Sequence, residues 1–373
     1  MGDARIYESV PNFSEGRRAG VIAELSRAAA RAHLLDTDPD PDHNRVVISI
    51  AGVKDRLVDA LIATAGEAVQ RIDVTRHAGV HPRVGAADVV PIVPLGGSTL
   101  EQCRELAREI GQRFWSELRV PVYFYGEGEG RSLADIRNGR AKPDLGGPSP
   151  HPTAGAVCVG ARPALVAFNV LLPGSDLTTA RAVARTIRES GAGMRGVQAL
   201  VFELPGGRLQ LSMNLFRIDE SSPSAVIAEL GRLGVSVGAE QLVGLCPAGV
   251  ANGAATGRIL EGRLASAAAV AAAARCEEAG DEERAALAAR LRAEASALAG
   301  LGIEQDAVLA GAERSAALIP VLRAGGVLDD ELESLLAVAA RGLRAAVTAG
   351  TQALYGARIA ALDARLSSGR GGG

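Results

Sequence analysis

The sequence predicts an α+β fold made of two ferredoxin-like subdomains of βαββαβ type, followed by an all-helical C-terminal region. Over the first 175 residues, short β-branched runs alternate with amphipathic stretches. The next part of the chain reads strand, helix, strand, strand, helix, strand. Beyond about residue 255, Ala, Leu, Arg and Glu dominate. We therefore expect subdomains at residues 1–175 and 176–255 and a helical region at 256–373.

The elements of the first subdomain follow from hydrophobic periodicity. Short apolar runs predict strands, and stretches with apolar residues three and four apart predict helices. A long Pro- and Gly-rich segment, 138–155, predicts an irregular loop, because such residues remove hydrogen-bond donors and regular torsions. A loop of that length is typical of a binding element. The expected order is strand Val46–Ile50, helix Asp55–Arg71, strand Val89–Pro94, helix Leu100–Leu118, strand Val120–Tyr125 and the loop.

From Ala161 onward the chain shows a similar alternation. A buried apolar run comes first, and two later alternating runs predict a hairpin. The expected order is strand Ala161–Leu172, helix Leu177–Ser190, strands Val197–Leu204 and Leu209–Leu215, helix Ser221–Leu233 and a short strand Val235–Gly238.

The last third of the chain has helical spacing throughout. We expect helices at Asp281–Leu298, Ile303–Arg323 and Leu328–Leu366. Asp329 or Asp330 is placed to cap the third helix.

Composition narrows the function classes. The 373 residues carry 40 Lys+Arg and 43 Asp+Glu, a net charge of -3, which argues against a nucleic-acid partner. No segment reaches the roughly 20 uninterrupted apolar residues that a bilayer crossing needs, so we expect no membrane partner and a cytoplasmic protein. The four cysteines lie far apart without Cys-x-x-Cys spacing, which favours reduced thiols.

Two patterns resemble metal sites, and both fail. His77 and His81 have the spacing of a helical metal pair, but Gly79 and Pro82 oppose a helix there. The alternating aspartates from Asp36 to Asp42 imitate a calcium loop, yet proline stands where that loop needs glycine and valine where it needs glutamate. The sequence therefore predicts no metal.

His81 is a candidate proton carrier. It lies in the loop segment HAGVHPRVG, just before an expected strand. An imidazole with an unperturbed pKa of about 6.5 can take and give a proton near neutrality. A structural histidine is the alternative reading of the same residue.

Several segments together resemble the glutamate formimidoyltransferase family over about residues 5–250. The HPR and HPTAG blocks carry most of the likeness, because they are far more specific than a short regular expression. The segments are VPNFSEGR (10–17), DHNRVV (42–47), HAGVHPRVGAADVVPIVPL (77–95), VPVYFYGE (120–127), ADIRNG (134–139), PDLGGPSPHPTAGAVCVGAR (143–162), ALVAFNVLL (164–172), SMNL (212–215) and VGLCP (243–247).

The resemblance implies transfer of the formimidoyl group from N-formimidoyl-L-glutamate to N5 of tetrahydrofolate, the co-substrate, in histidine degradation. It implies that His81 is the catalytic base and that Asp38 supports it. The folate-contacting loop would be Gly146, Gly147, Pro148, Ser149, Pro150, His151, Pro152, Thr153, Ala154 and Gly155. The two substrates would lie between the ferredoxin-like halves.

Other site residues follow from the chemistry of these substrates. Arg45 and Arg83 are the loop arginines that we expect to bind the glutamate carboxylates. Asn12 either contacts a ligand through its amide or serves as a turn amide after Pro11. We expect small-molecule substrates and a homodimer in which the helical region has a part.

Two alternatives stay open at the level of sequence. One is a catalytically silent folate-binding or assembly module that keeps the pocket without turnover. The other is a related transferase that uses a formyl donor, since donor choice depends on where one or two polar groups point. The Ala-rich tail is either a reduced relative of a formimidoyltetrahydrofolate cyclodeaminase or an unrelated helical appendage.

Overall fold

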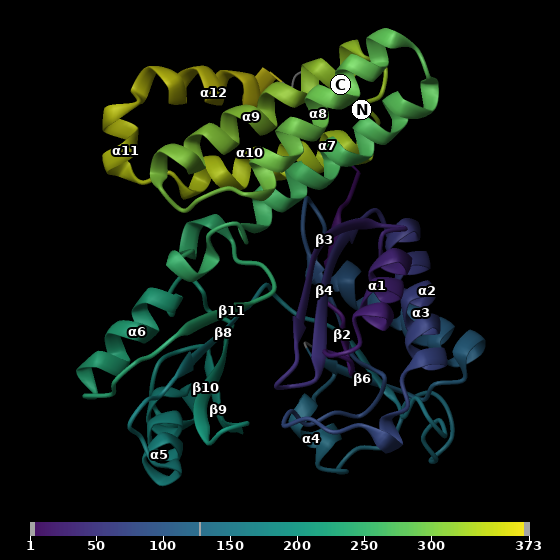
Figure 1. The fold of residues 1–373 in the computed structure, drawn as a ribbon, viewed down its shortest axis with the longest axis vertical. Helices are drawn as coiled ribbons and strands as arrows, with labels where there is room; N and C mark the ends of the chain where they lie inside the picture. Colours follow the sequence, from purple (N-terminus) through teal and green to yellow (C-terminus); the bar gives the residue numbers. More distant parts are fainter. Residues whose placement is uncertain (1–3, 127, 369–373) are drawn as a thin grey trace. The chain divides into compact units, whose positions relative to one another are not determined.

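The computed structural model describes residues 4–126 and 128–368. These residues divide into two compact units, one at Tyr7–Gly244 and one formed by the chain from Leu245 onward together with the segment before Tyr7. The first unit contains both β-sheets, and the second is helical (Figure 1). Mixed sheets followed by an all-helical region confirm the predicted fold class at that level.

The first sheet has seven strands in the described part of the chain. β4 pairs with β3 on one side and with β1 and β2 on the other, and β1 and β2 pair in turn with β5, all antiparallel. β7 and β6 extend the sheet beyond β5 in parallel. The strands are β1 (Tyr7–Ser9), β2 (Asn12–Phe13), β3 (His33–Asp40), β4 (Arg45–Gly52), β5 (Ala87–Pro94), β6 (Val122–Gly126) and β7 (Val157–Ala161).

Three helices, α1 (Ala19–Ala29), α2 (Lys54–Arg71) and α3 (Leu100–Leu118), cover one face of this sheet (Figure 1). Thr99 begins α3 with a reciprocal capping box to Gln102, which satisfies two backbone donors at the helix start. A short helix, α4 (Leu133–Arg137), follows β6.

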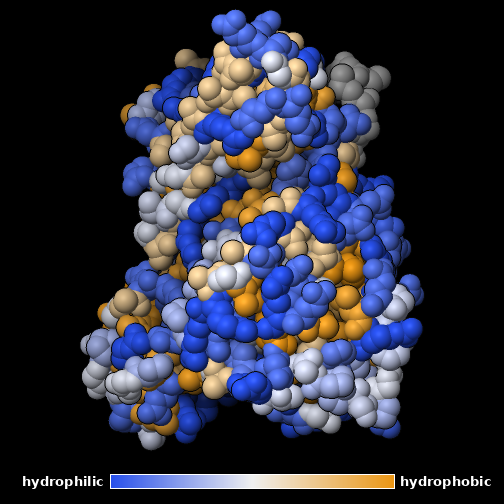
Figure 2. Space-filling view, turned by 45° about the vertical axis from the view of Figure 1, so that its right-hand side comes forward, coloured by the Kyte–Doolittle hydropathy of each residue, from blue (hydrophilic) through white to orange (hydrophobic). Residues whose placement is uncertain are grey.

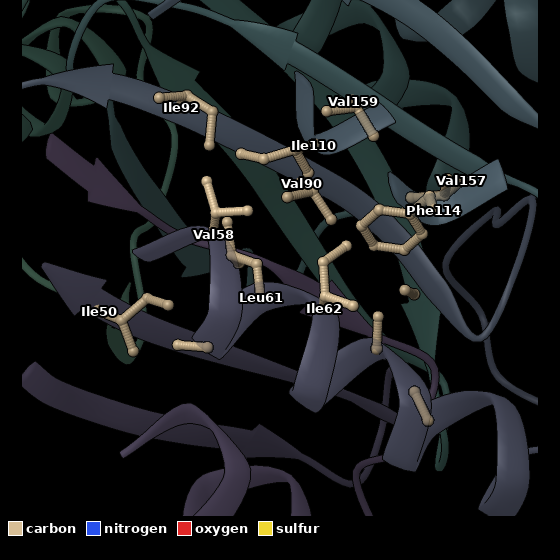
Figure 3. Packing of buried hydrophobic residues seen from close by; sticks show 14 of the residues in the cluster. Ile50, Val58, Leu61, Ile62, Val90, Ile92, Ile110, Phe114, Val157 and Val159 are labelled. Carbon is tan, nitrogen blue, oxygen red and sulfur yellow. The ribbon is translucent and has the colours of Figure 1, made fainter. Parts of the chain in front are cut away.

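The core of the first sheet lies between its strands and these helices. Apolar side chains of α2 and α3 point toward those of β4, β5 and β7, as Figure 3 shows for Leu61, Phe114, Ile50, Val90 and Val157. All five are almost fully buried. Burial of so many large side chains stabilises the scaffold to which the loops at the site are attached.

The second sheet has four strands in the order β11-β8-β10-β9, all antiparallel. One face carries buried apolar side chains such as Phe168, Leu211 and Met213, whereas the other face carries amides such as Asn169 and Gln210. The elements are β8 (Val166–Leu171), α5 (Leu177–Ile187), β9 (Val197–Leu204), β10 (Arg208–Leu215), α6 (Pro223–Arg232) and β11 (Glu240–Val243).

Two predicted strands of this region are wrong in their bounds. The run 161–172 is not one strand, because Pro163 separates the end of β7 from the start of β8. The last strand lies at 240–243 rather than at 235–238. Val235 is instead used to end α6: its N–H donates to the Leu230 carbonyl, past Gly234 in the left-handed region (φ +72°).

The helical unit confirms the predicted helices and corrects two details. Asp329 caps α10 by accepting from the Leu332 N–H. The expected helix 328–366 is three helices, broken near Val347 and Tyr355. Sequence reasoning also missed α7, whose Ala-rich faces carry little polar contrast. The helices are α7 (Leu260–Ala279), α8 (Glu282–Ala299), α9 (Gln305–Ala324), α10 (Asp330–Ala346), α11 (Ala349–Leu354) and α12 (Gly356–Ser368).

Figure 2 shows hydrophobic residues in patches edged by hydrophilic ones on the side turned forward. Within residues 4–126 and 128–368, no helix is long and apolar enough to cross a bilayer. Cys103, Cys158, Cys246 and Cys276 are buried free thiols.

Candidate functional site

His81 lies in the loop before β5, and both of its ring nitrogens have partners. Nδ1 is 2.8 Å from the Pro82 carbonyl oxygen, and Nε2 is 3.1 Å from Nη1 of Arg45 at the start of β4. A carbonyl can only accept and a guanidinium can only donate. His81 is therefore the neutral tautomer with its proton on Nδ1 and its lone pair on Nε2.

Burial and neighbouring cations keep His81 neutral. Burial, followed by the positive charges of Arg45 and Arg137, lowers the pKa of His81 from 6.5 to about 2. Burial also lowers the pKa of Arg45, against the opposing effect of Asp88, Asp40 and Asp38. The free site is thus rich in cations around an unprotonated imidazole.

A buried ion pair lies beneath this cluster. Arg137, the last residue of α4, donates from Nη2 to Oδ2 of Asp88 on β5 at 2.7 Å. The Asp88 side chain is only 3% exposed, and its other oxygen accepts from the Val84 N–H at 2.6 Å. Nε of Arg137 is buried without a hydrogen-bond partner. The buried Asp88 carboxylate thus pairs with one guanidinium group and acts on that of Arg45 as well, and such a group of arginines is suited to binding a further anion.

Arg83 supports the backbone of the His81 loop. Its Nη2 and Nε donate to the His81 carbonyl at 2.7 and 3.2 Å, and its Nη1 lies 2.7 Å from Nε2 of His77. Gly79 in the same loop sits where a Cβ would meet the His43 carbonyl at 2.5 Å. The loop is thus held closely against the β3–β4 turn.

The predicted folate loop is attached next to His81. Gly155 bridges to Gly85, and the Ala86 and Ala156 N–H groups donate across the same junction to Ala154 and Val84. A Cβ on Gly85 would meet the Ala156 carbonyl oxygen at 1.9 Å, so only glycine permits this approach. Residues 146–150, by contrast, are exposed. One end of the loop is fixed beside the histidine and the middle is open to solvent.

His151 organises the fixed end of that loop. Its Nδ1 accepts from the Thr153 and Ala154 N–H groups at 3.3 and 3.0 Å, and its backbone exchanges hydrogen bonds with Gly155. Pro152 is exposed between these residues.

Asp38 contacts a residue far along the chain, whereas Asn12 contacts its own turn. Asp38 on β3 accepts from the Gly244 N–H at 2.9 Å, and its charge acts on Arg45. The group at Nδ1 of His81 is the Pro82 carbonyl and not a carboxylate. Asn12 donates from Nδ2 to the Val10 carbonyl at 3.0 Å, the geometry of a turn amide.

The β3–β4 turn joins the first sheet to the amide-bearing face of the second. Nε2 of His43 lies 2.8 Å from Oε1 of Gln210 on β10, and Arg208 pairs with Asp42 at 2.7 Å. Phe202 on β9 contacts both imidazoles, with ring centroids 5.1 Å from His43 and 5.6 Å from His81. The candidate site is thus built from both sheets.

Sequence reasoning missed His43, Arg137 and Phe202 as site residues. Arg137 stands in the ADIRNG block and His43 in the DHNRVV block, so the blocks themselves were the available signal. No sequence signal marks Phe202 as a site residue, since an aromatic residue on a strand usually belongs to the core.

Two open hollows on the surface are lined by residues other than His81. They measure about 750 and 740 Å³ and lie beside α2 and α3 and around residues 129–144. Within the described residues, no set of three or more His, Cys, Asp or Glu side chains is arranged to hold a metal ion.

Comparison with known proteins gives consistent matches. Residues 6–162 match the model of the formiminotransferase domain, N-terminal subdomain. A glutamate formimidoyltransferase from Streptococcus pyogenes is 35% identical over 66% of this chain and 90% of its own length. One from Thermoplasma acidophilum is 38% identical over 65% and 88%. A formimidoyltransferase-cyclodeaminase from Sus scrofa is 38% identical over 65% of this chain and 50% of its own length.

Proposed function

Because the chain belongs to the glutamate formimidoyltransferase family, we propose that it transfers the formimidoyl group from N-formimidoyl-L-glutamate to N5 of tetrahydrofolate in histidine degradation. The observation that carries the proposal is His81 itself: it is neutral, its lone pair is on Nε2, and it contacts residues of both sheets. Tetrahydrofolate is a co-substrate in this reaction.

The reaction needs one proton to be moved. N5 attacks the amidine carbon to form a tetrahedral adduct, and the bond from that carbon to the glutamate nitrogen then breaks. The N5 proton must leave, and the glutamate nitrogen must gain a proton. Nε2 of His81 takes the proton from N5 and delivers it to the glutamate nitrogen. This acid–base step accelerates the reaction by ~10²- to 10⁴-fold. The products are 5-formimidoyltetrahydrofolate and glutamate.

Arg45 links substrate binding to the base. In the free site its guanidinium occupies the Nε2 lone pair of His81. A substrate carboxylate that pairs with Arg45 draws the guanidinium away and offsets its charge. Binding therefore uncovers the lone pair and raises the pKa of His81 toward its ordinary value.

The other predicted site residues take supporting roles. Asp38 stabilises the imidazolium through its charge, which also acts on Arg45. Arg83 holds the loop through the His81 carbonyl, and its role as a carboxylate ligand stays a prediction. The exposed Gly146–Pro150 segment is free to contact folate, and Asn12 stays a prediction as a ligand contact.

Finer features of the architecture belong to the same proposal. Each sheet contains the four-strand order expected of a ferredoxin-like unit: β11-β8-β10-β9 in the second, and β5, β1 with β2, β4, β3 in the first. The predicted boundary at residue 175 fits better between β7 and β8, where the family match also ends. A homodimer and a cytoplasmic location remain predictions.

The test is the reaction itself. Purified protein is incubated with N-formimidoyl-L-glutamate and tetrahydrofolate, and 5-formimidoyltetrahydrofolate is measured. We expect product with the wild type and a loss of ~10²- to 10⁴-fold with His81→Ala. His33→Gln is the matched control, since His33 is a buried histidine at the start of β3. Folate binding without any turnover would favour a silent module, and turnover only with N-formylglutamate would favour a formyl donor.

A further inference from the structure

His43 is a buried histidine whose second nitrogen is unused. The residue is 2% exposed, and its Nδ1 is buried without a hydrogen-bond partner. A buried polar atom left unpaired is destabilising, so such an atom calls for an explanation. Its other nitrogen, Nε2, is engaged with Gln210 on the second sheet.

A chain of amides fixes which nitrogen carries the proton. An ionised carboxylate only accepts, so Gln241 must present its Nε2 to Oδ2 of Asp40, at 3.4 Å. Oε1 of Gln241 then accepts from Nε2 of Gln210 at 3.2 Å and from Asn169 at 3.1 Å. Gln210 is left to present Oε1 to His43. The proton of His43 is therefore on Nε2, and the unused Nδ1 is a lone pair.

This lone pair belongs to the same cluster as His81. The two imidazole centroids are 6.0 Å apart, and Phe202 packs against both rings. The unused nitrogen therefore belongs to a ring that lies beside the imidazole we propose as the base. We propose that Nδ1 of His43 accepts a hydrogen bond from an N–H of the formimidoyl group and so selects an amidine over a formyl donor.

The selection rests on the proposed function and on one difference between donors. The formimidoyl group ends in nitrogen that carries hydrogen, whereas a formyl group ends in an oxygen that can only accept. Opposite the lone pair of His43, the N–H of a formimidoyl group forms a hydrogen bond. The oxygen of a formyl group would instead place two acceptors against each other. A site built to form a hydrogen bond with one group rejects an analogue that cannot form that bond.

The kinetic test compares two donors. With tetrahydrofolate fixed, kcat/KM is measured for N-formimidoyl-L-glutamate and N-formyl-L-glutamate. We expect His43→Phe, which keeps a ring and removes the lone pair, to reduce the preference by about 10- to 100-fold, because the formimidoyl donor loses a hydrogen bond and the formyl donor loses an unfavourable pair of acceptors. Asn214→Ala is the control: this exposed amide shares β10 and its face with Gln210, and the preference should not change. An equal loss with both donors, or an unchanged preference, would overturn the inference.

A second variant and a spectrum keep the test decisive if His43→Phe does not fold. Gln210→Met leaves His43 in place and removes the acceptor that fixes its proton, so we expect a smaller fall in preference, about threefold to tenfold. In ¹⁵N spectra of the wild type, Nδ1 of His43 should give the signal of an unprotonated ring nitrogen, and this signal should shift with formimidoylglutamate but not with formylglutamate. A protonated Nδ1, or no shift on binding, would refute the assignment.

The same spectrum separates this inference from the proposed function. If the wild type binds formimidoylglutamate without transferring the group, the proposed function fails. The shift of the Nδ1 signal then tests whether the substrate donates a hydrogen bond to His43, and this test does not need turnover.

Discussion

Nη1 of Arg45 donates to Nε2 of His81 at 3.1 Å, so it covers the lone pair that we propose as the proton acceptor of the reaction. The contact joins the start of β4 to the loop before β5, 36 residues further along the chain. A cation bound to a base both stabilises its neutral form and blocks it. We therefore expect an anionic substrate that pairs with Arg45 to release the imidazole for the reaction.

Replacing Arg45 should change binding and the pH profile together. Arg45→Met removes the cation next to Nε2, so the pKa of His81 should rise from about 2 toward 6.5. The acid limb of kcat/KM should then move to higher pH, and KM for the glutamate donor should rise about tenfold or more. An NMR titration of the His81 ring gives the pKa directly. Arg56→Met, on the exposed side of α2, is the control, and an unmoved titration would contradict the assignment.

His81 should also make stability depend on pH. Its pKa is lower in the folded protein than in the unfolded chain, so below about pH 6.5 the unfolded chain binds a proton that the folded one does not. This contribution to stability is therefore complete above pH 6.5 and is lost progressively as the pH falls toward 2. Urea midpoints at pH 7.5 and 5 should differ less in His81→Gln than in the wild type. Equal differences would contradict the burial of a neutral imidazole.

Replacing each of two arginines near the end of α4 should change the free energy of unfolding by very different amounts. Arg137→Met leaves Asp88 buried and unpaired, which should destabilise the protein by about 3–5 kcal/mol. Arg140→Met removes a side chain that is 71% exposed and 3.6 Å from Asp135, so the change should be within about 0.5 kcal/mol. Denaturant unfolding measures both. Similar values for the pair would mean that the Asp88 site tolerates an unpaired charge.

Two glycines test how the folate loop is attached. In Gly85→Ala the new Cβ meets backbone oxygens of Ala154 and Ala156, which cannot move aside, so we expect a loss of about 1–3 kcal/mol and faster proteolysis of the loop. Gly147→Ala lies in open space in the same loop and should change stability by less than about 0.5 kcal/mol. Thermal unfolding and limited proteolysis distinguish the two. A stable Gly85→Ala protein would show that the bridge to Gly155 is dispensable.

Local patterns allowed much of the fold to be predicted. The helices α2, α3, α5 and α6 follow from apolar spacing, and the loop 138–155 follows from its Pro and Gly content. Strand ends were less certain because a proline or a helix cap overrides an apolar run, as at Pro163 and Val235.

The site was predictable only where a single segment carries it. His81 and the loop 146–155 were named from their own blocks, whereas the partners of His43 lie as far as 167 residues away. Such pairs are set by how the two sheets pack, which periodicity does not encode. Nor does the sequence show that Nδ1 of His81 faces the carbonyl of the next residue, Pro82, while the supporting role of Asp38 stays a prediction.

The β3–β4 turn meets the second sheet through His43 with Gln210 and Asp42 with Arg208, and Asp38 on β3 accepts from Gly244, just after β11. Apart from the Phe202 ring, which packs on His43 and His81, these contacts are polar, and each can be exchanged for one with water, so parting them exposes little hydrocarbon to solvent. We therefore expect a bulky heterocycle to enter or leave by loosening these contacts, while the hydrophobic interior of each sheet stays closed.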